Sequence, residues 1–163
     1  MVLIVEGRDR ECYTYAYPRA ALTVDIILIA VLKQSPYLLL IERGKPPFEG
    51  CFAFPGGFVN EDETLEWAAG RELKEETGFW IKNYNLEFKA FKPYSDPQRD
   101  PRGRTITMVY STILHTDHLP EVCGGDDASK ALWFPINELP SLAFDHKKII
   151  QDFLNSYHPE KLQ

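Results

Sequence analysis

The stretch Gly57–Phe79, GFVNEDETLEWAAGRELKEETGF, contains the clearest helix of the chain. Its apolar and small residues recur at the three- and four-residue spacing of one helix face. That face consists of Leu65, Ala68, Ala69 and Leu73. We therefore predict a helix over Glu61–Thr77, with Asp62 or Thr64 as its N-cap. Gly78 follows at the position where a left-handed C-cap residue is favoured.

Near the end of the same helix, Glu72, Glu75 and Glu76 are spaced i, i+3 and i+4. At about 100° per residue, their side chains fall within an arc of roughly 100°. Like charges this close cost a helix ~0.2–0.5 kcal/mol per pair, and a solvated acidic face is the plain alternative. However, Ala68 and Ala69 flank the arc, and small residues let another segment approach closely. Clustered carboxylates in such a place suit a divalent cation such as Mg²⁺.

The spacing of these residues resembles the signature of the Nudix hydrolase family. Gly57 is followed after five residues by Glu63, and after seven more by the run Arg71–Phe79. The pattern matches at each defined position, and Phe79 stands where the family more often has an aliphatic residue. The resemblance implies hydrolysis of a nucleoside diphosphate linked to another group, without a covalent intermediate.

The resemblance also implies a role for each matched residue. Mg²⁺, or alternatively Mn²⁺, would be held by Glu72, Glu75, Glu76 and the backbone of Gly57. Catalysis would depend on Glu75, on Arg71, which would orient a glutamate, and on Glu63, which would anchor Arg71. The alternative for Glu63 and Arg71 is that they only fasten the loop to the helix.

The segments that flank the signature indicate the substrate. They resemble ADP-ribose pyrophosphatases and the ADP-ribose-sensing Nudix domains of NAD-metabolism repressors. These segments are Tyr17–Arg19, Arg43–Phe48, Tyr94–Arg104, Gly125–Ala128 and Leu142–His146. A pyrophosphate needs cations besides the metal, and adenine stacks on an aromatic face. The expected substrate-binding residues are Arg19, Arg43, Lys45, Tyr94, Arg99, Arg102 and Arg104, although a solvated surface charge is the alternative for each arginine.

Two adjacent acids lie in a loop near the C-terminal third of the chain. After loop closure, Asp127 would serve as general base or as an extra metal ligand, and the alternative is that Asp126 and Asp127 only form a turn. By contrast, Asp145 and His146 are expected to cap the last helix and to take no part in catalysis.

The remaining pattern predicts the fold. Two hydrophobic strands, Leu22–Lys33 and Tyr37–Glu42, are expected to pair as a hairpin with a turn at Ser35–Pro36. Further elements are expected as strands over Phe52–Phe54, Leu86–Tyr94, Thr105–His115 and Lys130–Pro135, a break at Pro55–Gly57, and a helix over Asp145–Tyr157. This order lacks regular β-α-β alternation, so we predict an α+β fold, an α/β/α sandwich with a mixed β-sheet between helices.

Composition limits the other properties of the chain. Its 163 residues include 18 Lys and Arg against 24 Asp and Glu, a formal net charge of −6 that argues against nucleic-acid binding. Three widely spaced cysteines are typical of reduced thiols in the cytoplasm, and the longest apolar stretch is too short to cross a membrane. We expect a loosely held lead-in over residues 1–12 and one domain over residues 13–163. The family resemblance implies that the protein could form a homodimer.

Two alternatives remain open. The protein could hydrolyse another nucleotide, such as an oxidised nucleoside triphosphate, a dinucleoside polyphosphate or NADH. It could instead be a non-catalytic regulatory domain that senses ADP-ribose, in which case the complete set of signature residues would be unneeded. An inert scaffold fits poorly with that set.

Overall fold

The computed structural model describes residues 4–6, 12–125 and 128–156. Its elements in chain order are β1 (Ile4–Glu6), β2 (Cys12–Thr14), β3 (Ala21–Leu32), β4 (Ser35–Arg43), β5 (Phe52–Ala53), β6 (Gly56–Phe58), α1 (Leu65–Thr77), the 3₁₀ helix η1 (Ile81–Tyr84), β7 (Lys89–Tyr94), β8 (Thr105–Thr116), β9 (Ala128–Pro135) and α2 (His146–Ser156). β1 and β2 pair antiparallel in a small sheet of their own. The other strands within the described ranges form a seven-stranded sheet.

The larger sheet is mixed. Its main path runs β5-β4-β3-β8-β7, with β6 paired to β3 and β9 paired to β4. β3 and β8 run parallel, from Ala21 opposite Thr105 to Leu32 opposite Thr116, whereas the other pairs are antiparallel. β3 is therefore the central strand, and it also holds the short β6 strand that leads into α1.

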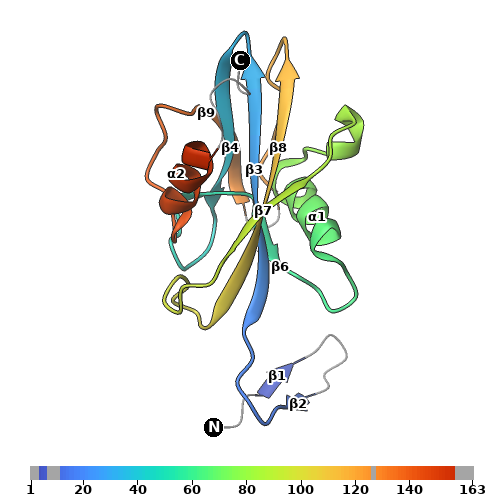
Figure 1. Cartoon of the computed structure of the whole chain (residues 1–163), viewed down its shortest axis with the longest axis vertical. Helices are drawn as coiled ribbons and strands as arrows, with labels where there is room; N and C mark the ends of the chain where they lie inside the picture. The colour runs from blue at the N-terminus through green and yellow to red at the C-terminus, as the bar shows by residue number, and fades with distance from the viewer. Residues whose placement is uncertain (1–3, 7–11, 126–127, 157–163) are drawn as a thin grey trace.

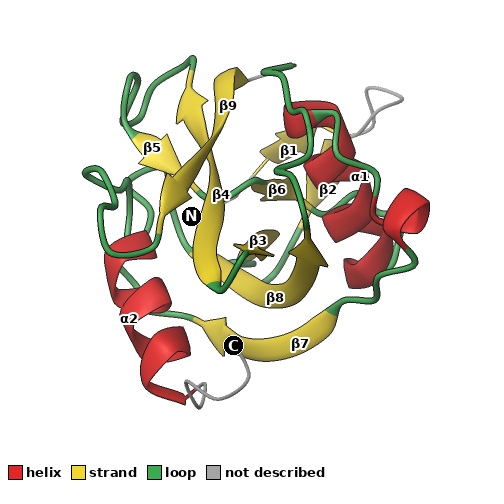
Figure 2. Cartoon of the chain, turned by 90° about the horizontal axis from the view of Figure 1, so that it is seen from above, coloured by secondary structure: helices red, strands yellow, loops and turns green. Residues whose placement is uncertain are grey.

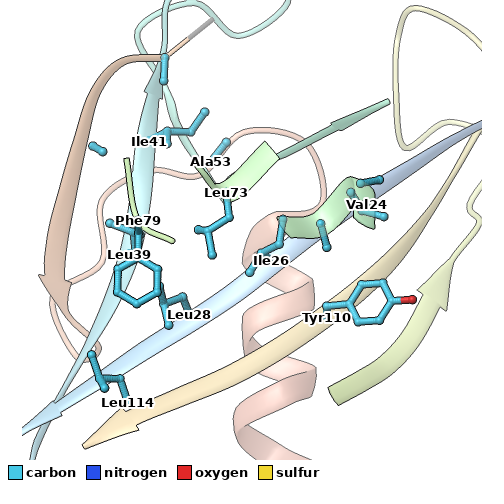
Figure 3. Close-up of a cluster of buried hydrophobic side chains, with 14 of the residues drawn as sticks. Val24, Ile26, Leu28, Leu39, Ile41, Ala53, Leu73, Phe79, Tyr110 and Leu114 are labelled. Atoms are coloured by element: carbon cyan, nitrogen blue, oxygen red, sulfur yellow. The ribbon is translucent and has the colours of Figure 1, made fainter. Parts of the chain in front are cut away.

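The two α-helices cover opposite faces of the sheet, as Figures 1 and 2 show. Alternate residues of β3 serve the two layers, because successive side chains of a strand point to opposite faces. Those that pack with Leu73 of α1 are Val24, Ile26 and Leu28 (Figure 3), and those that pack with Ile149 of α2 are Ile27, Ile29 and Val31. The predicted α/β/α sandwich with a mixed sheet is confirmed.

The helix α1 begins four residues later than the predicted Glu61, at Leu65. Thr64 is its N-cap, and the Thr64 hydroxyl accepts a hydrogen bond from the backbone N–H of Trp67 at 3.3 Å. The predicted C-cap is confirmed, since Gly78 has a left-handed φ of 70° and donates its N–H to the Lys74 carbonyl.

The β3–β4 hairpin turns at Lys33 and Gln34, which have φ of 47° and 69°. The predicted turn at Ser35–Pro36 is wrong, because Ser35 already pairs with Leu32. A two-residue loop with positive φ at both positions matches the twist of the flanking strands. Neither residue is of the Asn or Gly type that usually marks such a loop, so the sequence pattern did not indicate it.

Several other predicted boundaries differ from the structure. The predicted break at Pro55–Gly57 is wrong for its two glycines, because Gly56–Phe58 forms β6 and pairs with Thr23–Asp25 of β3. β7 begins at Lys89 and not at Leu86, because η1 and its left-handed C-cap Asn85 occupy the chain just before. β9 begins at Ala128, before the predicted start at Lys130. The predicted end of the last helix, Tyr157, lies outside the described residues.

The first residue of α2, His146, ties this helix to the sheet. Its Nδ1 accepts a hydrogen bond from the backbone N–H of Phe54 at 3.0 Å, and the two rings stack with centroids 4.6 Å apart. Its Nε2 lies 3.4 Å from a carboxylate oxygen of Asp25. The capping role expected for its side chain is therefore wrong, because the ring is buried against Phe54, just after β5.

None of the described helices has the length and hydropathy needed to cross a bilayer.

Complete burial lowers the pKa of His146 below its ordinary value, although the Asp25 carboxylate opposes this shift. The unfolded imidazole takes up a proton near pH 6.5, whereas the folded imidazole resists it, so protonation favours unfolding below that pH. We expect the free energy of unfolding of wild type, relative to His146→Gln, to fall by up to about 1.4 kcal/mol per pH unit between pH 6.5 and 5. Urea titrations of both proteins measure it. A difference that does not change with pH would contradict a neutral buried imidazole.

Candidate active site

A polar pocket of about 260 Å³ opens where β3, β6 and α1 meet. Its charged lining combines four acids with four arginines. These residues are Asp25, Glu72, Glu76, Asp100, Arg43, Arg71, Arg99 and Arg102. The pocket thus brings the signature helix together with three of the predicted substrate-binding arginines.

The two glycines of β6 let the strand lie directly against α1. The backbone N–H of Gly56 donates to the Glu76 carboxylate at 2.9 Å. A Cβ atom on Gly57 would overlap the Glu72 carboxylate, and one on Gly56 would overlap the Val24 carbonyl oxygen. Glycine at both positions therefore permits the close approach. On the helix, Ala68 and Ala69, the small residues expected to let another segment approach, are completely buried.

The carboxylates Glu72 and Glu76 lie in an environment that disfavours their charged forms. Burial raises the pKa of Glu76 to about 8, and repulsion from Glu72 and Asp25 adds to this against the opposing Gly56 hydrogen bond. Burial likewise raises the pKa of Glu72, and the hydrogen bond from Arg71 opposes it. A cation bound beside such a pair would stabilise the charged forms of both carboxylates.

Arg71 is the hub that joins the remaining signature residues. It donates from Nε and Nη2 to Glu63 at 2.9 and 2.6 Å, and from Nη1 to Glu72 at 2.7 Å and Glu75 at 3.0 Å. Its Nη2 also donates to the Phe58 carbonyl of β6 at 3.0 Å. These hydrogen bonds lower the pKa of Glu63 and raise that of Arg71. The carboxylate of Glu75, 44% exposed, lies outside the lining of the pocket.

Within the described part of the chain, no three histidine, cysteine, aspartate or glutamate residues are grouped so as to hold a metal ion. Arg71 explains much of this arrangement, since it binds Glu72 and Glu75 while Glu76 accepts from Gly56. The donor set nevertheless fits a hard divalent cation. Two buried carboxylates with raised pKa lie beside a glycine backbone that approaches them, and such cations prefer oxygen ligands.

The predicted arginines of the pocket differ in how they are held. Arg99 is only 4% exposed and forms ion pairs with Asp145 at 2.8 Å and with Asp25 at 3.4 Å. Arg102 is bound by Asp100, which accepts from its Nε and Nη2, and these bonds outweigh burial and lower the pKa of Asp100. Arg99 therefore supports the floor of the pocket, whereas the more exposed Arg102 lies at its mouth.

The other predicted substrate-binding residues lie outside the lining of this pocket. The Arg19 guanidinium stacks over Tyr15 at 3.7 Å, and Arg104 donates to the Ser95 carbonyl. Tyr94 is buried beside α2, donates its hydroxyl to Asp152 at 3.0 Å, and lines an adjoining pocket. Lys45 accepts from Arg43 through its backbone carbonyl. The predicted Asp127 lies outside the described residues.

Sequence reasoning missed the acids and the histidine beneath the pocket. Asp25 accepts from the Thr107 hydroxyl at 2.7 Å and lies within ion-pair distance of Arg99 and His146. The signal for Asp25 was available, because a charged residue inside a strand buried on both faces needs a partner. His146 gave no such signal, since its contact with Phe54 spans most of the chain.

Comparison with known proteins adds independent evidence. The family model of the NUDIX domain matches residues 20–153. An ADP-ribose pyrophosphatase of Methanocaldococcus jannaschii is 43% identical over 152 residues, which cover 93% of this chain and 82% of that protein. The ADPR-responsive transcriptional repressor NtrR of Acinetobacter baylyi is 32% identical over 139 residues, which cover 83% of this chain and 53% of the repressor.

A solved structure agrees with the sequence relatives. The NUDIX domain of Shewanella oneidensis NrtR in complex with ADP-ribose has a TM-score of 0.75 and 29% identity, over 86% of this chain and 90% of that one. The signature on α1, the sandwich around it and these relatives lead to the same conclusion: the chain belongs to the Nudix family and is a Nudix hydrolase.

Proposed function

We propose that this protein hydrolyses ADP-ribose to AMP and ribose 5-phosphate with Mg²⁺, or alternatively Mn²⁺. The observation that carries the proposal is the pocket in which the buried carboxylates Glu72 and Glu76 face Arg43 and Arg102. Acids that can hold a cation and arginines that can bind phosphate oxygens are what a pyrophosphate substrate requires. The 43% identity to an ADP-ribose pyrophosphatase supports the choice of substrate.

Nudix hydrolases need a divalent metal ion. We propose that Glu72, Glu75, Glu76 and the backbone of Gly57 hold it in this chain. A divalent cation bound there neutralises pyrophosphate charge and lowers the pKa of a bound water. Glu75 is the most exposed of the three carboxylates, so its carboxylate oxygens can take the proton of an attacking water. Asp127 is the second candidate for this role.

The arginines have separate tasks in this proposal. Arg43 and Arg102 bind the phosphate oxygens, since both line the pocket and a guanidinium offers paired donors. Arg71 acts as a positioning residue, because it connects Glu63 and the Phe58 carbonyl to Glu72 and Glu75. The rigid connection fixes the acids before substrate binds.

A second candidate function is sensing of ADP-ribose without turnover. It is favoured by the likeness to the NrtR domain bound to ADP-ribose and to the repressor NtrR. The complete set of signature glutamates favours the enzyme instead. We further propose a cytoplasmic homodimer that does not bind nucleic acid. The acidic net charge of the chain supports the proposal that it does not bind nucleic acid. Cys51 and Cys123, both without a disulfide, support the cytoplasmic location.

The proposed reaction makes a direct prediction about products. With Mg²⁺, the protein should convert ADP-ribose to AMP and ribose 5-phosphate, whereas NADH, a diadenosine polyphosphate and 8-oxo-dGTP should react more slowly. Mass spectrometry after reaction in ¹⁸O-labelled water identifies the products and the phosphorus that is attacked. Binding of ADP-ribose without any turnover would instead favour the sensor.

Glu76→Gln should lose activity and gain metal-free stability. Because burial raises the pKa of Glu76, its ionisation favours unfolding as the pH rises from about 4.5 to 8. The neutral amide can still accept from Gly56, so metal-free Glu76→Gln should be more stable at pH 8 by on the order of 4 kcal/mol. Activity should fall by about 100-fold or more, because a metal ligand is lost.

Urea unfolding and steady-state rates measure both effects, and Glu66→Gln on the same helix is the matched control outside the pocket. Mg²⁺ should raise the melting temperature of wild type and of Glu66→Gln more than that of Glu76→Gln. Wild-type rates in Glu76→Gln at saturating Mg²⁺ would contradict the assignment of this carboxylate.

Arg71→Lys should lower kcat by roughly 10- to 100-fold, because an ammonium cannot hold four partners in the fixed fork of a guanidinium. KM for ADP-ribose should change by less than about 3-fold, since Arg71 acts on the carboxylates and not on the substrate. Steady-state kinetics at saturating Mg²⁺ separates the two parameters. A large rise in KM with an unchanged kcat would show that Arg71 binds substrate.

A further inference from the structure

Phe144, just before α2, contacts two arginines of the pocket. The centre of the Arg43 guanidinium is 5.0 Å from its ring centroid, and that of Arg102 is 5.6 Å away. Phe144 also lines both the catalytic pocket and an adjoining pocket of about 770 Å³. A guanidinium within about 6 Å of an aromatic ring is attracted to the electrons of its face.

The backbone of Phe144 is held in an unfavourable conformation. Its φ of 52° lies in the left-handed region, which bulky residues rarely adopt. Phe48, whose φ is 63°, shares this property, and the two rings meet edge to face with centroids 4.8 Å apart. Such strain persists only where the surroundings enforce it, and it is concentrated at functional sites. The strain at Phe48 and Phe144 therefore indicates that the site requires this arrangement of the two rings.

Each arginine beside Phe144 is also held by acceptors of its own loop. Arg43 donates from Nε to the Pro47 carbonyl at 2.7 Å and from Nη2 to the Lys45 carbonyl. Arg102 donates to Asp100 and lies 5.0 Å from the Phe58 ring. The Phe144 ring is a contact that the two arginines share.

The ring of Phe144 contacts other protein groups as well. Besides the two guanidiniums it contacts Phe48 and, at 5.5 Å between centroids, His146. The residue is half-buried, and these contacts give it a route to the substrate through the arginines.

We propose that Phe144 is a positioning residue which spaces Arg43 and Arg102 so that both reach the linked phosphates of the substrate. This inference rests on the proposed function, because it takes the pyrophosphate of ADP-ribose as the group that the two arginines bind. Its chemical consequence is affinity: the ring should affect substrate binding through the arginines and leave the carboxylates of α1 unchanged.

The experiment is a mutant cycle read by steady-state kinetics with ADP-ribose and Mg²⁺. Phe144→Leu should raise KM by about 10-fold and change kcat by less than about 3-fold, whereas Phe144→Tyr, which keeps the ring, should stay within about 2-fold of wild type. In the background Arg43→Met/Arg102→Met, Phe144→Leu should add less than about 2-fold. Phe134→Leu, which removes a ring remote from the pocket, is the matched control.

A second variant guards against loss of folding. Phe144→Gly removes the ring but tolerates the left-handed backbone, which should offset part of the lost packing, and the folded variant should still show the rise in KM. A full effect of Phe144→Leu in the double-arginine background, or an unchanged KM in Phe144→Leu and Phe144→Gly, would overturn the proposal.

The same cycle separates this inference from the proposed function. If wild type does not turn over ADP-ribose, the proposed function fails. The cycle is then read on the affinity for inorganic pyrophosphate with Mg²⁺ by calorimetry, where the same loss in Phe144→Leu and the same absence of further loss in the double-arginine background are expected. Equal pyrophosphate affinities of wild type and Phe144→Leu would overturn the inference by itself.

Discussion

The rest of the site depends on the close approach of the Gly56–Gly57 backbone to α1. A side chain at Gly56 would overlap the backbone carbonyl of Val24, and one at Gly57 would displace the Glu72 carboxylate. The approach brings a backbone N–H to Glu76 and a backbone carbonyl of β6 to Arg71. It also encloses the carboxylates and removes them from water. The raised pKa of Glu76 is the electrostatic result of that packing.

The molecule balances this concentration of acids with cations arranged around it. Arg71 holds the carboxylates of Glu72 and Glu75, and Arg99 stabilises Asp25 and Asp145 beneath the pocket. Arg43 and Arg102 both contact the ring of Phe144, whose left-handed backbone is itself unfavourable. Glu76 and Phe144 thus reduce stability in the absence of ligands, and both lie where a metal and a pyrophosphate would be bound.

Local patterns in the sequence were sufficient to predict α1, its Gly78 cap and the sandwich, because helix periodicity and capping act over a few residues. They were not sufficient for the hairpin turn, where Lys33 and Gln34 adopt a conformation that neither prefers. The site divides in the same way. The contacts of Arg71 with Glu63 and with a glutamate of α1 span one segment and followed from the family resemblance, whereas those of Asp25 and His146 join distant parts of the chain.

Because burial raises the pKa of the Glu76 carboxyl to about 8, we expect it to be largely protonated at pH 7 until a divalent cation binds beside it. Calorimetric titration with Mg²⁺ in two buffers of different ionisation enthalpy counts the protons released on binding. Because the pKa of Glu76 is raised to about 8, metal binding should release about one proton at pH 7 and close to none at pH 9.5. Release of no proton at pH 7, or of the same number at both pH values, would contradict a Glu76 carboxyl that is protonated before the metal binds.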